Sequence, residues 1–226
     1  MERTASEYFG NRAREYDSLI RRCVPRYDEM LERLVLYLPA EAASVVDLGT
    51  GTGNCALLLA ERYAGAGLTC VDAAQEMLDV TRARLGARAA RTEFRCARFE
   101  DLRLPPRSVQ LVTSCISLHH VVDKAALYAA LFDALEPGGW LVFADQMAGA
   151  TEHAHGVNWS AWQDFCRAEG NCSAEELQSL LDHARAHDHY TSVPEHLALL
   201  AAAGFEELDC VWRNWIWGIV SARRPR

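Results

Sequence analysis

The stretch that decides the fold is Val45-Val46-Asp47-Leu48-Gly49-Thr50-Gly51-Thr52-Gly53-Asn54. Its apolar start predicts a short buried strand over 45–48, and the residues after it predict a helix over 55–63. Three glycines at alternate positions lie between the two elements. Glycine is needed there either for a positive φ or because a ligand approaches too closely for any Cβ. The stretch therefore predicts a small molecule held by backbone groups at the end of a strand.

The segments that follow indicate which small molecule this is. The G-x-G-x-G spacing lacks the G-x-G-x-x-G pattern that binds a pyrophosphate. The second strand, 68–72, ends in Asp72, which is suited to accept hydrogen bonds from both hydroxyls of a ribose. With the segments 73–78, 111–120 and 135–143, this order resembles the class I methyltransferases that use S-adenosylmethionine (SAM), over about residues 9–221. The resemblance implies SAM as cofactor and a Rossmann-like α/β fold.

The order of predicted elements agrees with that fold. Strands are predicted over 45–48, 68–72, 93–96, 109–115 and 140–145, and helices over 55–63, 75–85 and 124–135. Such alternation predicts βαβ units around a mostly parallel sheet. The last two strands, 207–213 and 215–222, are too close together for a helical crossover, so they are expected to form an antiparallel hairpin and complete seven strands.

Two helical segments lie outside this alternation. Residues 8–38 predict an N-terminal helical cap, and residues 148–191 form an insertion with helices over 159–168 and 174–187. A further helix over 193–203 returns the chain to the sheet. Ligands of open α/β sheets bind above the carboxyl ends of the strands. We therefore expect a single domain over 1–226, with the insertion acting as a lid above that edge.

Composition narrows the class of partner. The chain has 226 residues and a net charge of −8, and its one lysine is Lys124. Such a surface repels phosphate backbones, so a nucleic-acid partner is not expected, while a homodimer is left open. The sequence shows no signal peptide and no long apolar run, which predicts a cytoplasmic protein without a membrane partner. The eight cysteines contain no C-x-x-C pair, so no metal is expected.

The resemblance implies a role for each residue of the cofactor site. Backbone amides of Gly49, Thr50 and Gly51 would meet the methionine part of SAM, and Asp47 would accept from its amino group. Asp72 would bind the ribose. The remaining residues expected at the cofactor are Tyr16, Tyr27, Ala73, Met77, Phe99, Glu100, Ser114 and Cys115. Relatives carry an aspartate for the adenine amino group where this chain has Ala97-Arg98-Phe99-Glu100, so Glu100 is the candidate acceptor.

Both ends of the chain resemble a narrower family, the carboxy-SAM synthases, which serve wobble-uridine modification in transfer RNA. The resemblance lies in 22–27 and 192–205, and Tyr27 matches a cofactor-contacting tyrosine of that family. Cys115, outside both segments, is at a position where the family has an asparagine. The family's arginine that pairs with the extra carboxylate falls at Leu199. Because leucine supplies no charge, a carboxylated cofactor is disfavoured. A carboxy-SAM synthase-like or tRNA-modification enzyme is the alternative reading.

Methyl transfer needs an aligned acceptor, exclusion of water and, for an unactivated hydroxyl or amine, a base. His119, after the fourth strand, is the first candidate base, and His153, His155, His189 and Tyr16 are the others. The expected substrate walls are Tyr8, Tyr16, His153, Trp159 and Trp162. A divalent ion on His153, His155 and Asp145 is a weaker alternative. The prediction is methyl transfer to oxygen or nitrogen of a small molecule, and a SAM-binding protein without turnover is the third possibility.

Overall fold

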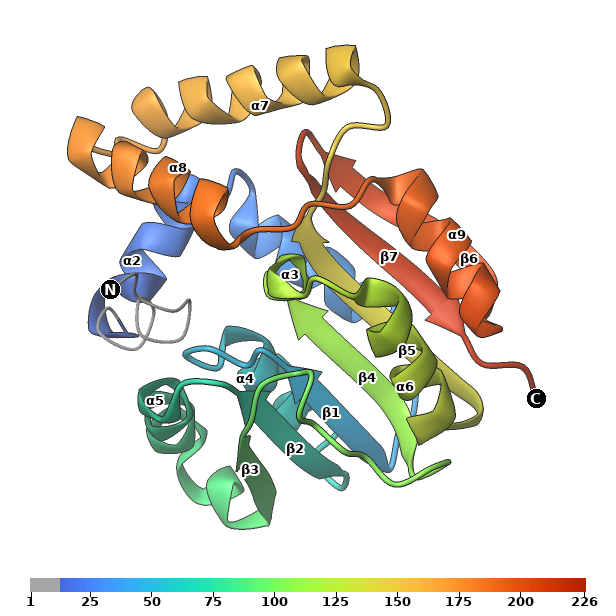
Figure 1. Cartoon of the computed structure of the whole chain (residues 1–226). Coiled ribbons are helices and arrows are strands. Elements are labelled where there is room, and N and C mark those ends of the chain that lie inside the picture. The colour runs from blue at the N-terminus through green and yellow to red at the C-terminus, as the bar shows by residue number, and fades with distance from the viewer. Residues whose placement is uncertain (1–12) are drawn as a thin grey trace.

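The computed structural model describes residues 13–226, which build a seven-stranded sheet in the order β3-β2-β1-β4-β5-β7-β6 (Figure 1). The strands are β1 Ser44–Leu48, β2 Gly67–Asp72, β3 Thr92–Cys96, β4 Val109–Cys115, β5 Leu135–Gln146, β6 Glu206–Asn214 and β7 Trp217–Arg223. The first five are parallel, and β7 pairs antiparallel with both β5 and β6. The predicted sheet and its C-terminal hairpin are confirmed.

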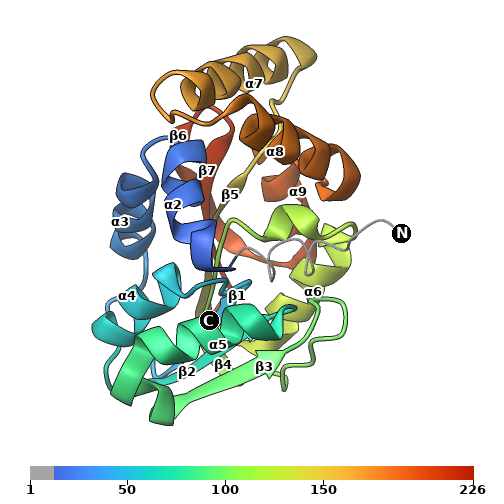
Figure 2. The same ribbon diagram turned by 90° about the vertical axis from the view of Figure 1, so that its left-hand side faces the viewer.

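Helices cover both faces of this sheet (Figure 2). On one face lie α3 Tyr27–Leu36, α4 Asn54–Arg62 and α5 Gln75–Leu85, and on the other lie α6 Lys124–Ala134 and α9 Val193–Ala203. Helices α7 Glu152–Arg167 and α8 Ala174–His187 lie above the carboxyl edge of the parallel strands, and α2 Ala13–Cys23 contacts both α5 and α7. None of the described helices is long and apolar enough to cross a membrane.

The central strands are buried on both faces, which explains their unbroken apolar runs. Val45 packs into the core under α3 and α4, while its neighbour Val46 packs into the core under α6. Successive side chains of a strand point to opposite faces, so one short segment supplies both cores. Strand β1 lies between β2 and β4, where the order of the sheet reverses. Ligands of such sheets bind at this reversal, which here is the end of β1 at Gly49.

The insertion leaves the sheet and returns to it at one place. Ala148 and Ser192 form an isolated parallel bridge, and the Ala148 amide donates to the Thr191 carbonyl over 3.1 Å. Every strand pairing of the sheet is made by residues outside 149–191. The architecture therefore supports the interpretation of this segment as an addition to a sheet that is complete without it.

The insertion is fastened to the N-terminal helix α2. Trp162 Nε1 donates to the Cys23 carbonyl over 2.7 Å. Arg22 donates to both carboxylate oxygens of Glu176, over 2.8 and 2.7 Å, in the paired geometry that suits a guanidinium. The described part of the N-terminal cap and the two insertion helices thus form one covering above the strand ends.

Some predicted boundaries were wrong. Helix α7 begins at Glu152 rather than at 159, because the Thr151 hydroxyl caps it by accepting from the Ala154 amide. Helix α6 ends at Ala134, and β5 already begins at Leu135, which pairs with Val109 across a bulge. The last strand begins at Trp217 instead of 215. These ends are set by local caps and pairing that hydrophobic periodicity does not report.

Candidate active site

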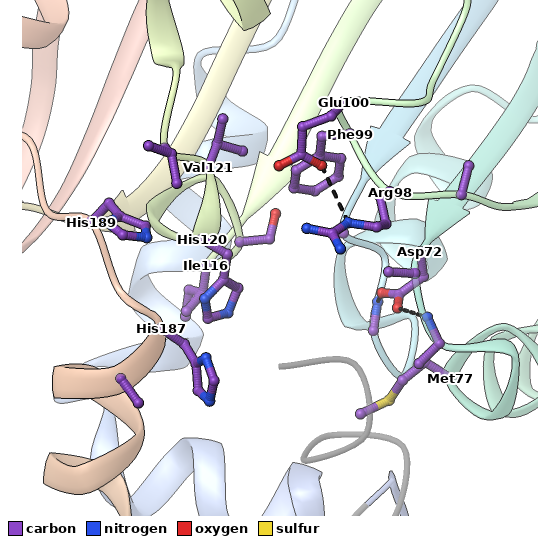
Figure 3. Close-up of a pocket in the computed structure, with 18 of the residues that line it drawn as sticks. Asp72, Met77, Arg98, Phe99, Glu100, Ile116, His120, Val121, His187 and His189 are labelled. Carbon is purple, nitrogen blue, oxygen red and sulfur yellow. Dashed lines mark hydrogen bonds and ion pairs between the residues drawn. The ribbon is translucent and has the colours of Figure 1, made fainter. Parts of the chain in front are cut away.

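A pocket of about 490 Å³ lies at the carboxyl edge of the sheet, within the range of about 300–1,000 Å³ typical of small-molecule sites. One wall comes from the loops after β1, β2 and β3, and includes Gly49, Asp72 and Phe99. The opposite wall comes from the segment after β4 and the end of α8, with His120 and His187 (Figure 3). The pocket therefore has a wall built by the sheet and a wall shared with the insertion.

Glycine is needed in the loop after β1 for two reasons: a positive φ angle and a lack of room for a Cβ. Gly49 has φ 65°, and a Cβ there would overlap the Ser117 side chain. Gly51 has φ 56° in open space, so it is required by conformation alone. Gly49 and Gly51 line the pocket, whereas Thr50 is buried behind it and donates its hydroxyl to the Asp47 carbonyl over 3.0 Å. The loop presents backbone to the pocket, as the sequence predicts.

Asp72 is held in a fixed orientation at the end of β2. Its Oδ2 accepts from the Gly51 amide over 2.8 Å and its Oδ1 accepts from the Ala74 amide over 2.9 Å. Burial raises the pKa of Asp72, and the same backbone hydrogen bonds oppose that rise. Each carboxylate oxygen has lone pairs left for another donor. Asp72 is thus a preoriented pair of acceptors on the pocket wall.

Asp47 lies beneath the glycine loop and is 1% exposed. It accepts from the Thr113 hydroxyl over 3.1 Å. Burial raises the pKa of Asp47 to about 6, although hydrogen bonds from Thr113, Thr50 and Cys55 favour the ionised form. The carboxylate is behind the pocket wall, so contact with a ligand requires it to reach past the loop or through a water molecule.

The adenine side of the prediction is reproduced in part. Ala73, Met77, Phe99 and Glu100 all line the pocket, as does Arg98, whose Nε lies 3.5 Å from Glu100 Oε2 (Figure 3). Three other predicted cofactor residues are not brought to the lining. Tyr27 accepts from Asn54 Nδ2 over 3.0 Å, Ser114 Oγ lies 2.6 Å from Ser117 Oγ, and Cys115 lies in the hydrophobic core. Their side chains support the wall from behind.

The residues predicted to bind the methyl acceptor are placed less as predicted than those of the cofactor site. Tyr16 lines the pocket, and Tyr8 lies outside the described residues. His153 is exposed in a shallow depression on the outside of α7, so its assignment as a substrate residue is corrected. Trp162 is 4% exposed and faces a smaller inner cavity of about 70 Å³, and Trp159 packs against it with ring centroids 4.9 Å apart. The tryptophans hold the insertion together instead of lining the pocket.

His119 is also placed differently from the prediction. Its ring is buried and faces the inner cavity, with Nδ1 2.5 Å from Asp145 Oδ1. Burial lowers the pKa of His119, but Asp145 and Asp188 outweigh that effect, so the net direction is upward. Because the ring lies outside the main pocket, His119 is a poor candidate for a general base acting on a molecule bound there. The histidines that reach the pocket are His120, His187 and the predicted His189.

The weaker metal alternative is corrected as well. His155 Nδ1 accepts from the Gly149 amide over 3.2 Å, and His153 points away from Asp145, which pairs with His119. These three predicted ligands are not brought together.

Two features were missed from sequence. Asp17 on α2 accepts from Thr52 Oγ1 over 2.6 Å and from Asn54 Nδ2 over 3.0 Å, which docks the N-terminal helix onto the glycine loop. No sequence pattern marked this contact. His187, by contrast, lies four residues after His183 on a predicted helix. That spacing places both rings on one face of the helix and is the signal that could have identified His187.

Comparison with known proteins agrees with this geometry. Residues 45–139 match a family described as a methyltransferase domain. The family match, the curated relatives and the solved neighbours support a SAM-dependent methyltransferase of the Rossmann-like class. The methyltransferase is 26% identical to the carboxy-S-adenosyl-L-methionine synthase of Shewanella loihica, over 87% of this chain and 83% of that protein.

A second curated protein and one solved structure are also similar to this chain. The methyltransferase is 32% identical to the malonyl-[acyl-carrier protein] O-methyltransferase of a Marinomonas species, over 70% of this chain and 57% of that protein. A solved methyltransferase in complex with the Haloferax volcanii Trm112 activator superposes with a TM-score of 0.73 over the full length of both chains, at 19% identity. That last similarity shows the fold alone.

Proposed function

We propose that this methyltransferase transfers the methyl group of SAM to an oxygen or nitrogen atom of a small molecule bound beneath α7 and α8. The observation that carries the proposal is the shared pocket, in which the glycine loop and Asp72 face His120, His187 and His189. The cofactor would occupy the sheet wall, and the acceptor would enter from the histidine wall. The net charge of −8 favours a small molecule over a nucleic acid.

The geometry supplies what methyl transfer requires. Alignment of acceptor and sulfonium carries much of the acceleration, and a cover excludes water. The cover is held down where the His189 amide donates to the His119 carbonyl over 2.7 Å and Lys124 Nζ donates to the His189 carbonyl over 2.6 Å. His187 and His189 are the histidines of the insertion that line the pocket, and either would accept the acceptor's proton.

Replacing Asp72 by alanine is expected to weaken SAM binding by about tenfold to a hundredfold. The change removes a charge-assisted hydrogen bond worth about 1.5–3 kcal/mol. Isothermal titration calorimetry with SAM measures this effect, and Asp79→Ala, an exposed aspartate on α5, is the matched control. Unchanged SAM affinity in Asp72→Ala, or tighter binding of NAD than of SAM by the parent, would contradict the assignment.

A second expected outcome concerns the acceptor. His187→Ala should keep SAM affinity and lose most turnover, because the ring lines the histidine wall while the sheet wall is intact. A panel of small hydroxyl and amine acceptors is screened by release of S-adenosylhomocysteine, with His153→Ala on the exposed face of α7 as control. If the His187 variant lost SAM affinity in proportion to activity, the histidine wall would belong to the cofactor.

The similarity to a carboxy-SAM synthase over most of the chain favours a second candidate function, synthesis or use of a carboxylated cofactor. Leu199 lies on α9, packed against the core beneath that helix and outside the pocket lining. Mass spectrometry of the nucleoside that copurifies separates the two functions. SAM or S-adenosylhomocysteine is expected, whereas carboxy-SAM would favour the second candidate.

A further inference from the structure

We propose that His119, His120 and Asp188 form a binding site for a divalent transition metal, with zinc(II) as the expected ion. The three residues lie where the segment after β4 meets the residue that follows α8. One ligand atom from each lies within 4.8 Å of the other two. The proposal does not depend on which acceptor the enzyme methylates.

The spacing of the ligand atoms suits a tetrahedral ion. Zinc bonds to imidazole nitrogen and carboxylate oxygen at about 2.0–2.1 Å, which separates two ligand atoms by about 3.3–3.4 Å. His120 Nδ1 lies 3.1 Å from Asp188 Oδ1, and His119 Nε2 lies 3.9 Å from the same oxygen. Side-chain shifts of less than about 1 Å would complete the site, because ordinary rotamer adjustment covers that range.

The longer of these distances leaves room for an ion, whereas the 3.1 Å between His120 Nδ1 and Asp188 Oδ1 is also a hydrogen-bond distance. At 3.9 Å, His119 Nε2 and Asp188 Oδ1 are too far apart for a hydrogen bond. An ion bonded to both atoms would bridge that gap. The observed arrangement therefore fits a site whose ligands converge on a point between them.

Outer contacts orient two of the ligands. Asp145 is 0% exposed, and its Oδ1 lies 2.5 Å from His119 Nδ1. A proton on Nδ1 leaves the Nε2 lone pair directed toward Asp188, in the carboxylate–histidine–metal arrangement that holds metal-bound imidazoles. Asp188 is oriented in turn, since the Tyr190 hydroxyl donates to its Oδ2 over 2.6 Å. Both outer partners are present with the ligands they would support.

The site has an entrance and an open position. His120 lines the main pocket, while His119 and Asp188 line the inner cavity on the other side of the same wall. An ion entering from the pocket would reach these three protein ligands, and its fourth position would be open to water or to His183, whose Nε2 lies 3.7 Å from Asp188 Oδ1. Three ligands with one open position are typical of zinc sites that bind or activate a small molecule.

The test measures metal content and affinity directly. The purified chain is loaded with Zn²⁺, dialysed against metal-free buffer and analysed by plasma mass spectrometry. One ion per chain is expected. His120→Gln and Asp188→Asn each remove a ligand, so they should weaken Zn²⁺ binding by more than the roughly tenfold to hundredfold that loss of an outer partner causes. His153→Gln, an exposed histidine on α7, should retain it. Substoichiometric zinc in the parent, or equal affinity in parent and His120→Gln, would overturn the proposal.

Cobalt substitution identifies the donor atoms. Bound at His119, His120 and Asp188, Co²⁺ should show visible bands of a tetrahedral nitrogen and oxygen site without a strong thiolate charge-transfer band. A thiolate band would assign the metal to cysteine and overturn the proposal. Thermal unfolding of each variant in EDTA controls for folding. His120→Gln is the primary variant because the His120 side chain is 20% exposed and its loss leaves the more deeply buried ligands in place.

Discussion

Replacing Trp162 by alanine is expected to lower the free energy of unfolding by about 3–5 kcal/mol, as for other buried aromatic side chains. The ring is 4% exposed, packs against Trp159 and borders the inner cavity, so its loss enlarges a void that neighbouring helices cannot fill. The change also removes the hydrogen bond from Nε1 to the Cys23 carbonyl. Chemical denaturation followed by circular dichroism measures the effect.

Val157→Ala provides the control on the same helix, because Val157 is 56% exposed. It should change stability by less than about 0.5 kcal/mol. The folded fraction of Trp162→Ala should still bind SAM, since the glycine loop and Asp72 are outside the affected region. A stability loss below about 1 kcal/mol would mean that the ring is not a structural anchor of the insertion.

Replacing Asp47 by asparagine is expected to stabilise the fold at neutral pH and to weaken SAM binding. Burial raises the pKa of Asp47 from 3.8 to about 6, so the folded state holds this proton more tightly than the unfolded chain does. The contribution of Asp47 to stability therefore falls as pH rises from about 4 to above 6. At about 1.4 kcal/mol per pKa unit, the ionised carboxylate costs about 3 kcal/mol at pH 7.

The two effects have opposite dependences on pH. Asp47→Asn should gain up to about 3 kcal/mol over the parent at pH 7.5, less what altered hydrogen bonds cost, and should lose that advantage near pH 4. The parent should bind SAM more tightly as pH rises through 6, because we expect the ionised carboxylate to bind the cofactor's ammonium group past the loop or through a water molecule. Asp79→Asn is the exposed control. An equal stability difference at both pH values would show that Asp47 is not the titrating group.

Much of the fold was predictable because local signals marked its boundaries. Helices α8 and α9 begin at capping boxes, Ser173 with Glu176 and Ser192 with Glu195, and both were predicted to the residue. Strand β4 and helix α5 also match their predicted bounds. The sheet wall of the pocket was predictable from the glycine spacing and the acid that ends β2, because these features act through backbone geometry that a short segment determines by itself.

The histidine wall was less predictable. His119 and His120 lie in a short 3₁₀ turn, Leu118–His120, where no periodicity indicates which ring faces the pocket. The structure turns His120 toward it and pairs His119 with Asp145. Likewise, the sequence placed His153 and His187 in the same insertion, but only the packing of α7 and α8 decides which one points inward. Those choices depend on contacts between distant segments.

Because the insertion joins the sheet through the bridge between Ala148 and Ser192, the segment between them can be exchanged for another. A segment that leaves and rejoins the sheet at one point can be replaced without breaking a strand pairing, provided that the graft restores the contacts of Trp162 and Glu176 with α2. If the proposed function holds, exchange of this segment is expected to change the acceptor and to leave the sheet wall of the pocket in place. In the laboratory, the same two residues are the natural splice points for building chimaeras with new acceptor preferences.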